Sequence, residues 1–261
     1  MSDAWNPAVY NQFTTERSQP FHDLLALLQP AGIRRAADLG CGTGELTRVA
    51  THQLKIREMV GIDNSPRMLA ETGANDGISF ELGEIATWTA APRFDLVLAN
   101  ASLQWVSDHP QVLRRWVAAL APGGQLAVQV PANAQMPSHR VAREVANDPQ
   151  FAAAFGPDGP PPDPVEQNVM EPQEYAQVLY DLGFEQQHVR LQIYPHLLDN
   201  SRSVIDWVRG TMLTRFQQRL DPETFAEFVS AYEQRLIATI GDRAPYFFPF
   251  RRILLWGRLA R

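Results

Sequence analysis

A glycine-rich loop between a short apolar segment and a helix-like segment constrains the fold of this chain most. The run Arg35–Leu39 leads directly into Gly40-Cys-Gly-Thr-Gly44, and residues 45–54 have the composition of a helix. A loop of this kind joins the first strand of an open α/β sheet to its first helix, where bare backbone N–H groups and the positive helix end face a ligand. The pattern therefore predicts an α/β fold with a nucleotide-like ligand.

The alternation of strand and helix signals continues along the first half of the chain. Strands are predicted at 59–62, 78–82, 94–99 and 125–130, and helices at 67–72 and 112–120. Ser65 and Pro66 supply an N-cap and a first helical residue for the helix at 67–72. The five βα-type repeats predict a parallel, doubly wound sheet.

The second half of the chain departs from this alternation. Eight prolines between 131 and 164 break the regular pattern. A helix at 174–182 and a strand at 189–194 then resume the sheet, and 201–219 and 222–240 are predicted as two amphipathic helices. A strand at 253–259 closes the sheet, antiparallel because no helix-sized crossover precedes it.

These signals predict five parts of the chain. They are an N-terminal helical flap over the cofactor at 1–30, an α/β core at 31–130, an irregular insertion at 131–171, sheet completion by 172–194 and 251–261, and a helical cap at 195–250.

Charge and cysteine content narrow the function classes. The chain has 23 basic and 29 acidic residues, a formal net charge of -6, which argues against capture of nucleic acid. The single cysteine excludes an internal disulfide, and the six histidines show no metal-ligand spacing. No apolar run approaches the roughly 18 residues that span a bilayer. We therefore expect a cytoplasmic protein with no nucleic-acid partner, no membrane partner and no metal.

The residues around the glycine loop narrow the choice of ligand. A dinucleotide fingerprint needs a third glycine at position 45, where Glu45 would bring negative charge toward a pyrophosphate. Asp38 would repel a phosphate but could receive an ammonium, and Asp63 ends the second strand about where an acid takes ribose hydroxyls. A zwitterionic ligand with a ribose is predicted, although a glycine triplet alone is equally compatible with a plain tight turn.

These motifs resemble those of the class I S-adenosylmethionine-dependent methyltransferases. Asp38-Leu-Gly-Cys-Gly-Thr-Gly44 is similar to the first motif of that family, and Gly61-Ile-Asp-Asn-Ser-Pro-Arg-Met68 to the second. The resemblance implies a Rossmann-like, doubly wound, mostly parallel seven-stranded sheet, with S-adenosylmethionine as cofactor and S-adenosylhomocysteine as product. The cofactor contacts that it implies are Asp38, Gly40, Cys41, Gly42, Gly44, Asp63, Asn64, Met68, Gly83, Glu84, Ile85, Asn100 and Trp105.

The resemblance also assigns roles to some of these residues. Asp63 would hold the ribose, and Asn64 and Met68 would flank the adenine. Glu84 stands where the family usually has an aspartate near the adenine amino group, so this position departs from the family pattern.

A narrower resemblance covers nearly the whole chain. Segments 5–20, 99–105, 129–131, 137–139, 206–208 and 248–252 are similar to the members of the family that esterify one carboxylate of trans-aconitate, a small tricarboxylic acid. The substrate contacts predicted on this basis and from the chemistry of a polyanion are Tyr10, Arg17, Trp105, His139, His196, Trp207, Arg251 and Arg252.

The chemistry of such a reaction sets what the site must contain. A carboxylate is ionised near neutral pH and is its own nucleophile, so no catalytic base is expected. Arginine can hold a carboxylate with two parallel hydrogen bonds. Arg251 and Arg252 point to opposite sides of an extended segment, so we expect one of them to reach the substrate. For each aromatic or arginine in the set, core packing or a solvated surface is the ordinary alternative.

Other functions remain open from the sequence. The substrate could be another small metabolite or an acyl-carrier-bound malonyl group, or the chain could be a non-catalytic regulator that binds S-adenosylmethionine. The expected assembly is a monomer or a weak homodimer.

Overall fold

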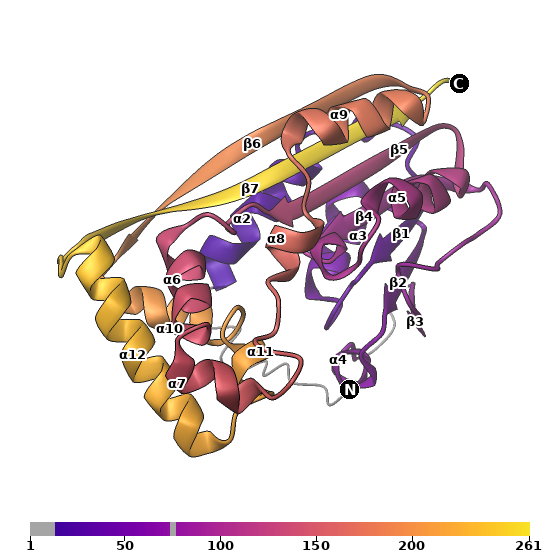
Figure 1. Cartoon of the computed structure of the whole chain (residues 1–261). Coiled ribbons are helices and arrows are strands. Elements are labelled where there is room, and N and C mark those ends of the chain that lie inside the picture. Colours follow the sequence, from indigo (N-terminus) through magenta and orange to yellow (C-terminus); the bar gives the residue numbers. More distant parts are fainter. Residues whose placement is uncertain (1–13, 74–76) are drawn as a thin grey trace. The chain divides into compact units, whose positions relative to one another are not determined.

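The computed structural model of the protein describes residues 14–73 and 77–261, which separate into two compact units. The first, called here the α/β unit, contains residues 17–132, 168–192 and 251–261. The second, called the helical unit, contains residues 133–167 and 193–250. Figure 1 shows the path of the chain through both.

The described residues form a seven-stranded sheet with the order β3-β2-β1-β4-β5-β7-β6 (Figure 1). Its strands are β1 (Arg35–Leu39), β2 (Glu58–Asp63), β3 (Ile78–Leu82), β4 (Phe94–Asn100), β5 (Leu120–Pro131), β6 (Phe184–Leu198) and β7 (Tyr246–Leu259). The pairs among β1 to β5 are parallel, whereas β7 runs antiparallel to β5. The predicted fold class and the antiparallel closing strand are confirmed.

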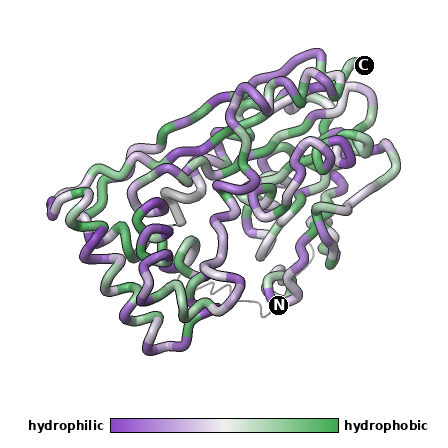
Figure 2. Tube along the Cα trace, in the orientation of Figure 1, coloured by the Kyte–Doolittle hydropathy of each residue, from purple (hydrophilic) through white to green (hydrophobic). Residues whose placement is uncertain are grey.

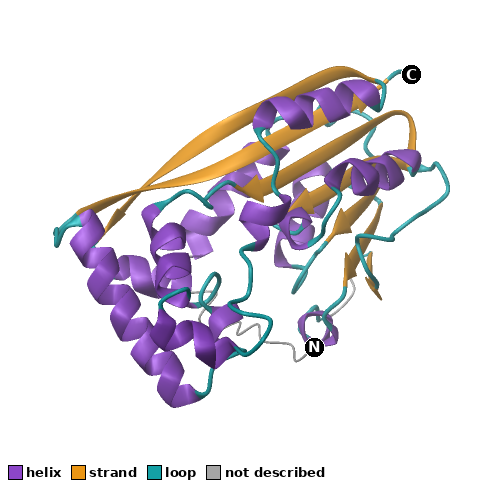
Figure 3. Ribbon diagram, viewed as in Figure 1, coloured by secondary structure: helices purple, strands orange, loops and turns teal. Residues whose placement is uncertain are grey.

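Both faces of the sheet in the α/β unit are covered by helices (Figure 3). Leu39, Val97 and Val128 share one hydrophobic cluster with residues of α5 (His109–Ala118) and α9 (Pro172–Asp181). Ala36, Leu98 and Ala127 share another with residues of α2 (Thr14–Leu25) and α3 (Glu45–Leu54). Successive side chains of a strand point to opposite faces, which explains why the middle of each central strand is mainly apolar.

The helix start predicted at Ser65 and Pro66 is confirmed, and Asp108 caps a second helix of the α/β unit. The Ser65 hydroxyl accepts a hydrogen bond from the Met68 backbone N–H at 3.1 Å, and Pro66 begins α4 (Pro66–Ala70). The short 3-10 helix η2 (Leu103–Trp105) follows β4. At the amino end of α5, the Asp108 carboxylate accepts from the Gln111 backbone N–H at 3.3 Å. Such side-chain acceptors satisfy N–H groups that the first helical turn leaves open.

The expectation of an irregular insertion at 131–171 is wrong, because this segment is largely helical. It contains α6 (Pro137–Ala146), α7 (Pro149–Ala152), η3 (Ala153–Phe155) and α8 (Pro164–Asn168). Each of the three α-helices begins with a proline, where the missing N–H costs no helical hydrogen bond. The prolines therefore start helices instead of breaking the chain into loops.

The helices predicted at 201–219 and 222–240 have different outcomes. The first is wrong as a single helix: α10 (Ser203–Arg209) ends at Gly210, and α11 (Thr214–Gln217) follows. The second is confirmed, since α12 spans Pro222–Ile240 and Asp221 caps it. Figure 2 shows hydrophilic and hydrophobic residues alternating along α12, and its apolar residues join the core of the helical unit. The strands β6 and β7 extend beyond the boundaries predicted at 194 and 251.

The N-terminal segment is described from Thr14, so residues 1–13, including Tyr10, lie outside the described part. The end of α2 and the turn after it belong to the core of the α/β unit, and the flap expected for the preceding residues stays a prediction. Phe21, Leu24 and Leu28 are buried in the core of the α/β unit, because their spacing places them on one stripe of the chain. Among the described residues, no helix has both the length and the apolar character needed to cross a membrane.

Candidate cofactor site

The glycine loop is fixed to the end of the neighbouring strand β2. The backbone N–H groups of Gly40 and Cys41 both donate to the Ile62 carbonyl, at 2.7 and 3.0 Å. Gly40, Gly42 and Gly44 have φ angles of 83°, 56° and 75°, in the left-handed region that favours glycine. The loop therefore turns sharply at the carboxyl ends of β1 and β2, where open α/β sheets bind ligands.

The three glycines differ in the space around them. A Cβ on Gly40 would lie 2.2 Å from the Ser102 Cβ, and one on Gly44 would lie 2.5 Å from the Phe80 ring. A Cβ on Gly42 would meet nothing within 4 Å. Gly40 and Gly44 are thus required by packing, whereas the backbone at Gly42 is open to a ligand.

Asp63 lies beside the open glycine. Its carboxylate accepts from the Gly42 backbone N–H at 2.8 Å and from the Ser65 backbone N–H at 2.9 Å. Its own carbonyl accepts from the Gly83 N–H at 2.9 Å. The Asn64 amide donates to the Glu84 carboxylate at 3.2 Å. The structure therefore brings these predicted cofactor residues together at the ends of β2 and β3.

Asp38 is the buried acid of the same region. It is 3% exposed, and the Thr47 hydroxyl donates to its carboxylate at 2.6 Å. The pKa of Asp38 is raised to about 6, chiefly by burial; the Thr47 hydrogen bond opposes this rise, and the nearby Asp63 carboxylate adds a smaller one. A cation placed beside this carboxylate would favour the ionised form. Burial raises the pKa of the neighbouring Cys41 thiol, so this thiol is unreactive, which leaves its backbone as the part that can contact a ligand.

Buried amides gather where β4 and β5 end. Asn100 and Gln129 are register partners, and the Asn100 Oδ1 and Gln129 Nε2 atoms are buried without a hydrogen-bond partner among the described residues. The Gln104 Oε1 atom shares this state. Trp105, at the end of η2, is 49% exposed. Sequence reasoning missed Gln104 and Gln129, although an amide inside the apolar run 126–130 is a usable signal.

Two further predicted cofactor residues, Met68 and Ile85, follow β2 and β3 in the chain. Met68 lies on α4 and is half-buried, and Ile85 follows β3 and is 8% exposed. The Ile85 carbonyl accepts from the Trp116 indole N–H at 2.9 Å, so its backbone is tied to α5. Ile85 therefore has a packing role in addition to any contact with a ligand.

The predicted substrate residues fall in both units. Arg251 and Arg252 are half-buried on β7 in the α/β unit, where the Arg251 carbonyl accepts from the Ala132 N–H at 3.0 Å. Arg17 lies on α2. In the helical unit, the His196 and Trp207 ring centroids are 4.8 Å apart, and His139 lies on α6 with its Nδ1 atom 3.2 Å from the Ser138 hydroxyl.

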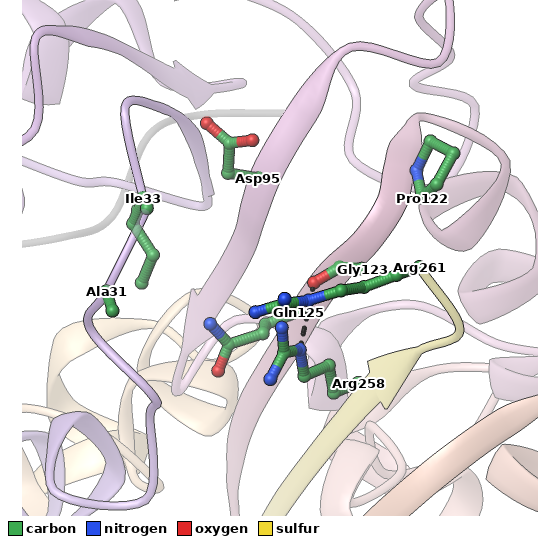
Figure 4. Close-up of a pocket in the computed structure, with 9 residues that line it drawn as sticks. Ala31, Ile33, Asp95, Pro122, Gly123, Gln125, Arg258 and Arg261 are labelled. Carbon is green, nitrogen blue, oxygen red and sulfur yellow. Dashed lines mark hydrogen bonds between the residues drawn. The ribbon is translucent and has the colours of Figure 1, made fainter.

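A cavity of about 350 Å³ lies elsewhere in the α/β unit (Figure 4). Its lining includes Ile33, Asp95 and Gly123, which lie just before or near the amino ends of β1, β4 and β5. The Arg258 guanidinium donates to the Gly123 carbonyl at 3.2 Å. The glycine loop follows the opposite, carboxyl end of β1, so this cavity is not the predicted cofactor site. Within the described ranges, no three His, Cys, Asp or Glu side chains gather as a metal site.

Comparison with known proteins defines the class. Residues 36–124 match a protein family described as a methyltransferase domain. Phosphoethanolamine N-methyltransferase 2 of Haemonchus contortus, solved with phosphomonomethylethanolamine and S-adenosylhomocysteine, has a similar fold. Its TM-score is 0.56 and its identity 15%, over 92% of this chain and 53% of that one. The protein is a methyltransferase of the class I fold.

Two curated relatives narrow the class to a family. The trans-aconitate 2-methyltransferase of Delftia acidovorans is 38% identical over 98% of this chain and 96% of its own length. That of Methylobacterium radiotolerans is 39% identical over 98% of this chain and 96% of its own length. The chain belongs to the trans-aconitate 2-methyltransferase family, and the predicted class and family are confirmed.

Proposed function

We propose that the protein transfers a methyl group from S-adenosylmethionine to one carboxylate of trans-aconitate, giving the methyl ester and S-adenosylhomocysteine. The observation that carries this proposal is the identity of 38–39% to trans-aconitate 2-methyltransferases over nearly the full length of the chain. The similarity includes the helical unit, so it is not confined to the part that binds the cofactor.

The residues of the candidate site fit S-adenosylmethionine. Gly42 leaves an open approach to the loop backbone, and Asp63 presents a carboxylate beside it for the ribose hydroxyls. The buried Asp38 carboxylate suits the ammonium of the methionine part. The unpartnered Asn100 Oδ1 is a further acceptor at the same edge of the sheet. The remaining cofactor contacts of the proposal are Gly40, Cys41, Gly44, Asn64, Met68, Gly83, Glu84, Ile85 and Trp105.

The chemistry needs little from the protein beyond binding and orientation. Bound S-adenosylmethionine supplies a methyl group on a positively charged sulfur. A substrate carboxylate oxygen forms the new bond to the methyl carbon, while the carbon–sulfur bond breaks and its electron pair stays on sulfur. The chain must align oxygen and methyl and keep water away from the nucleophile.

The substrate side of the proposal names Tyr10, Arg17, Trp105, His139, His196, Trp207, Arg251 and Arg252 as contacts. Arginine supplies the bidentate donors that a polyanion needs, and the rings exclude water. The proposal also includes a small-molecule substrate with no nucleic-acid or membrane partner, a monomer or weak homodimer, and a cytoplasmic location. The net charge of -6 supports the absence of a nucleic-acid partner. The single cysteine supports a location in a reducing compartment.

A methyl-transfer assay against a panel of acceptors tests the proposed function. The panel contains trans-aconitate, citrate, a monocarboxylate, a hydroxylated metabolite and a malonyl thioester, each with and without the protein. We expect turnover with trans-aconitate above all the others. Preference for the thioester or the hydroxyl acceptor would replace the proposed substrate, and binding of S-adenosylmethionine without turnover of any acceptor would indicate a regulator.

The affinity for S-adenosylmethionine is expected to fall in mild acid because of Asp38. The ionised carboxylate binds the ammonium, and its pKa without ligand is about 6, so the apparent dissociation constant rises about tenfold between pH 7 and pH 5. Calorimetry across this range measures the change, since the ligand's own groups titrate outside it. The matched variant Asp38→Asn should bind weakly with no such slope. A flat profile in the wild type would remove Asp38 from the ammonium site.

Replacing a histidine should not remove the methyl-transfer step, because the nucleophile arrives ionised. In His139→Ala and His196→Ala, kcat at saturating substrate should stay within about tenfold of wild type above the substrate's pKa values. His109 is less suitable because it is buried against Tyr175, with Nδ1 2.6 Å from the phenol oxygen. A loss of kcat beyond about 10³-fold with binding intact would indicate a general base and a hydroxyl or amine acceptor.

A further inference from the structure

A buried ion pair, flanked by two partly exposed charged side chains, lies in the helical unit, away from the glycine loop in sequence. Asp163 is 2% exposed, and its Oδ2 atom lies 3.1 Å from the Arg215 Nη1 atom. Arg143 flanks the same carboxylate at 3.9 Å and pairs with Glu166 at 3.1 Å. The Asp163 Oδ1 atom accepts from the Val165 backbone N–H at 3.0 Å. The carboxylate therefore forms an ion pair with one end of the Arg215 guanidinium, without a well-aligned hydrogen bond among the described residues.

The other edge of the Arg215 guanidinium is unsatisfied. The side chain is 12% exposed, and its Nε and Nη2 atoms are buried with no hydrogen-bond partner among the described residues. The guanidinium carbon lies 4.6 Å from the Phe216 ring centroid, a contact that uses the face of the group and not its N–H edge. Burying unpaired donors of a charged group costs free energy, and a bound ligand that accepts hydrogen bonds from them would remove this cost.

Three other arginines of the helical unit do not share this state. Arg235 places two donors on the Asp148 carboxylate, at 3.2 and 2.6 Å. Arg202 donates to Glu233 and to Asp242. Arg219 donates to the Phe155 carbonyl at 3.1 Å. These guanidinium groups have partners within the chain, whereas Arg215 is held by a single acid with one edge left over.

We infer that Arg215 is a carboxylate-binding residue of the helical unit, an inference that rests on the proposed function and names a substrate contact for it. The Nε and Nη2 atoms of a guanidinium lie on one edge, at the spacing of the two oxygens of a carboxylate. A substrate carboxylate takes this edge with two parallel hydrogen bonds, while Asp163 fixes the opposite side through Nη1. Because both atoms are buried, neighbouring side chains must shift to admit it, and water then competes little for the donors.

One of the predicted substrate residues faces the same cluster. Burial raises the pKa of Asp163, but the positive charge of Arg215 and, less strongly, that of His139 outweigh this and hold the pKa below its usual value. Asp163 thus stays ionised and keeps the guanidinium oriented. An acid such as Asp163, placed behind a guanidinium, is the arrangement expected when that guanidinium must hold a fixed orientation toward a bound carboxylate.

The test compares three variants of the full-length protein. Arg215→Lys keeps the positive charge opposite Asp163 but removes the two-donor edge. Asp163→Asn keeps the guanidinium and removes its buried ionic partner. Arg219→Lys is the matched control, because Arg219 lies four residues further along the chain and already donates to Phe155. For each, calorimetry measures the dissociation constant of trans-aconitate with S-adenosylhomocysteine present, kinetics measures KM and kcat, and melting measures Tm.

The expected result for Arg215→Lys is at least a tenfold rise in the dissociation constant and KM for trans-aconitate, with the affinity for S-adenosylhomocysteine within twofold of wild type. Arg219→Lys should stay within twofold for both ligands. Asp163→Asn should lower Tm more than Arg215→Lys does, since a buried cation then loses its partner. The inference is overturned if Arg215→Lys binds trans-aconitate like wild type and changes only Tm.

Failure of the proposed function gives a different pattern. A wild-type protein that binds trans-aconitate without methylating it contradicts the proposed function, while the comparison of dissociation constants still decides the role of Arg215. A wild-type protein that binds neither trans-aconitate nor citrate overturns the inference, because no carboxylate then occupies the edge.

Discussion

Replacing Arg251 or Arg252 by methionine should lower kcat/KM for trans-aconitate strongly at one of the two positions and hardly at the other. The two residues are consecutive on the extended strand β7, so their side chains leave it on opposite sides. Methionine keeps the aliphatic bulk and removes the bidentate donors. Losing one partner of a buried charge pair costs about 2–5 kcal/mol, or roughly 30- to several-thousand-fold in kcat/KM.

Steady-state kinetics with each variant measures this effect, and the affinity for S-adenosylmethionine is the internal control. The loss should lie mainly in KM for trans-aconitate, with cofactor affinity nearly unchanged. A surface arginine changes such constants far less. If both variants keep wild-type kcat/KM, neither arginine holds the substrate. A neutral metabolite becomes the better acceptor only if Arg215→Lys also leaves kcat/KM for trans-aconitate unchanged.

Alanine at Gly40 and at Gly42 should separate the folding role of the glycine loop from its binding role. Gly40→Ala forces a Cβ to within 2.2 Å of Ser102 at a φ of 83° and should reduce the free energy of unfolding by about 2–5 kcal/mol. Gly42→Ala meets nothing within 4 Å and should cost only about 1–2 kcal/mol, from its φ of 56°.

In the fraction of each variant that remains folded, S-adenosylmethionine binding should be weakened more by Gly42→Ala than by Gly40→Ala. The new methyl group of Gly42→Ala occupies the open side of the loop and should weaken S-adenosylmethionine binding at least about tenfold. Denaturant unfolding and calorimetry on the same preparations measure the two effects. Equal cofactor affinity of Gly42→Ala and wild type would place the ligand away from the loop, whatever the stability of Gly40→Ala.

Much of the α/β unit could be predicted because its signals are local. The strand at 78–82 and the helix at 45–54 have the predicted bounds. The cap by Ser65 and Pro66 was also predictable, since a hydroxyl followed by proline satisfies the first turn with neighbours in sequence. The ends of β2 and β3 then bring Asp63 and Glu84 near one another without further information.

The misses have physical causes of two kinds. Proline can begin a helix or end one, so the prolines of region 131–171 are compatible with helices and with irregular structure alike. The helices that form there depend on the packing of α6 in the core of the helical unit. The buried states of Gln129 and Arg215 also depend on tertiary packing, because nothing in their sequence neighbours shows which polar side chain loses its access to water. Sequence reasoning therefore favoured the arginines at 251 and 252 and passed over Arg215.

The most direct test of the proposed reaction is the fate of a labelled methyl group. The protein is incubated with trans-aconitate and S-adenosylmethionine that carries a labelled methyl, and the products are analysed by mass spectrometry and NMR. We predict that the label appears on a carboxylate oxygen of trans-aconitate, with one S-adenosylhomocysteine formed per ester. Label on a carbon atom of trans-aconitate, or no labelled product from any polycarboxylate, would contradict the proposed reaction.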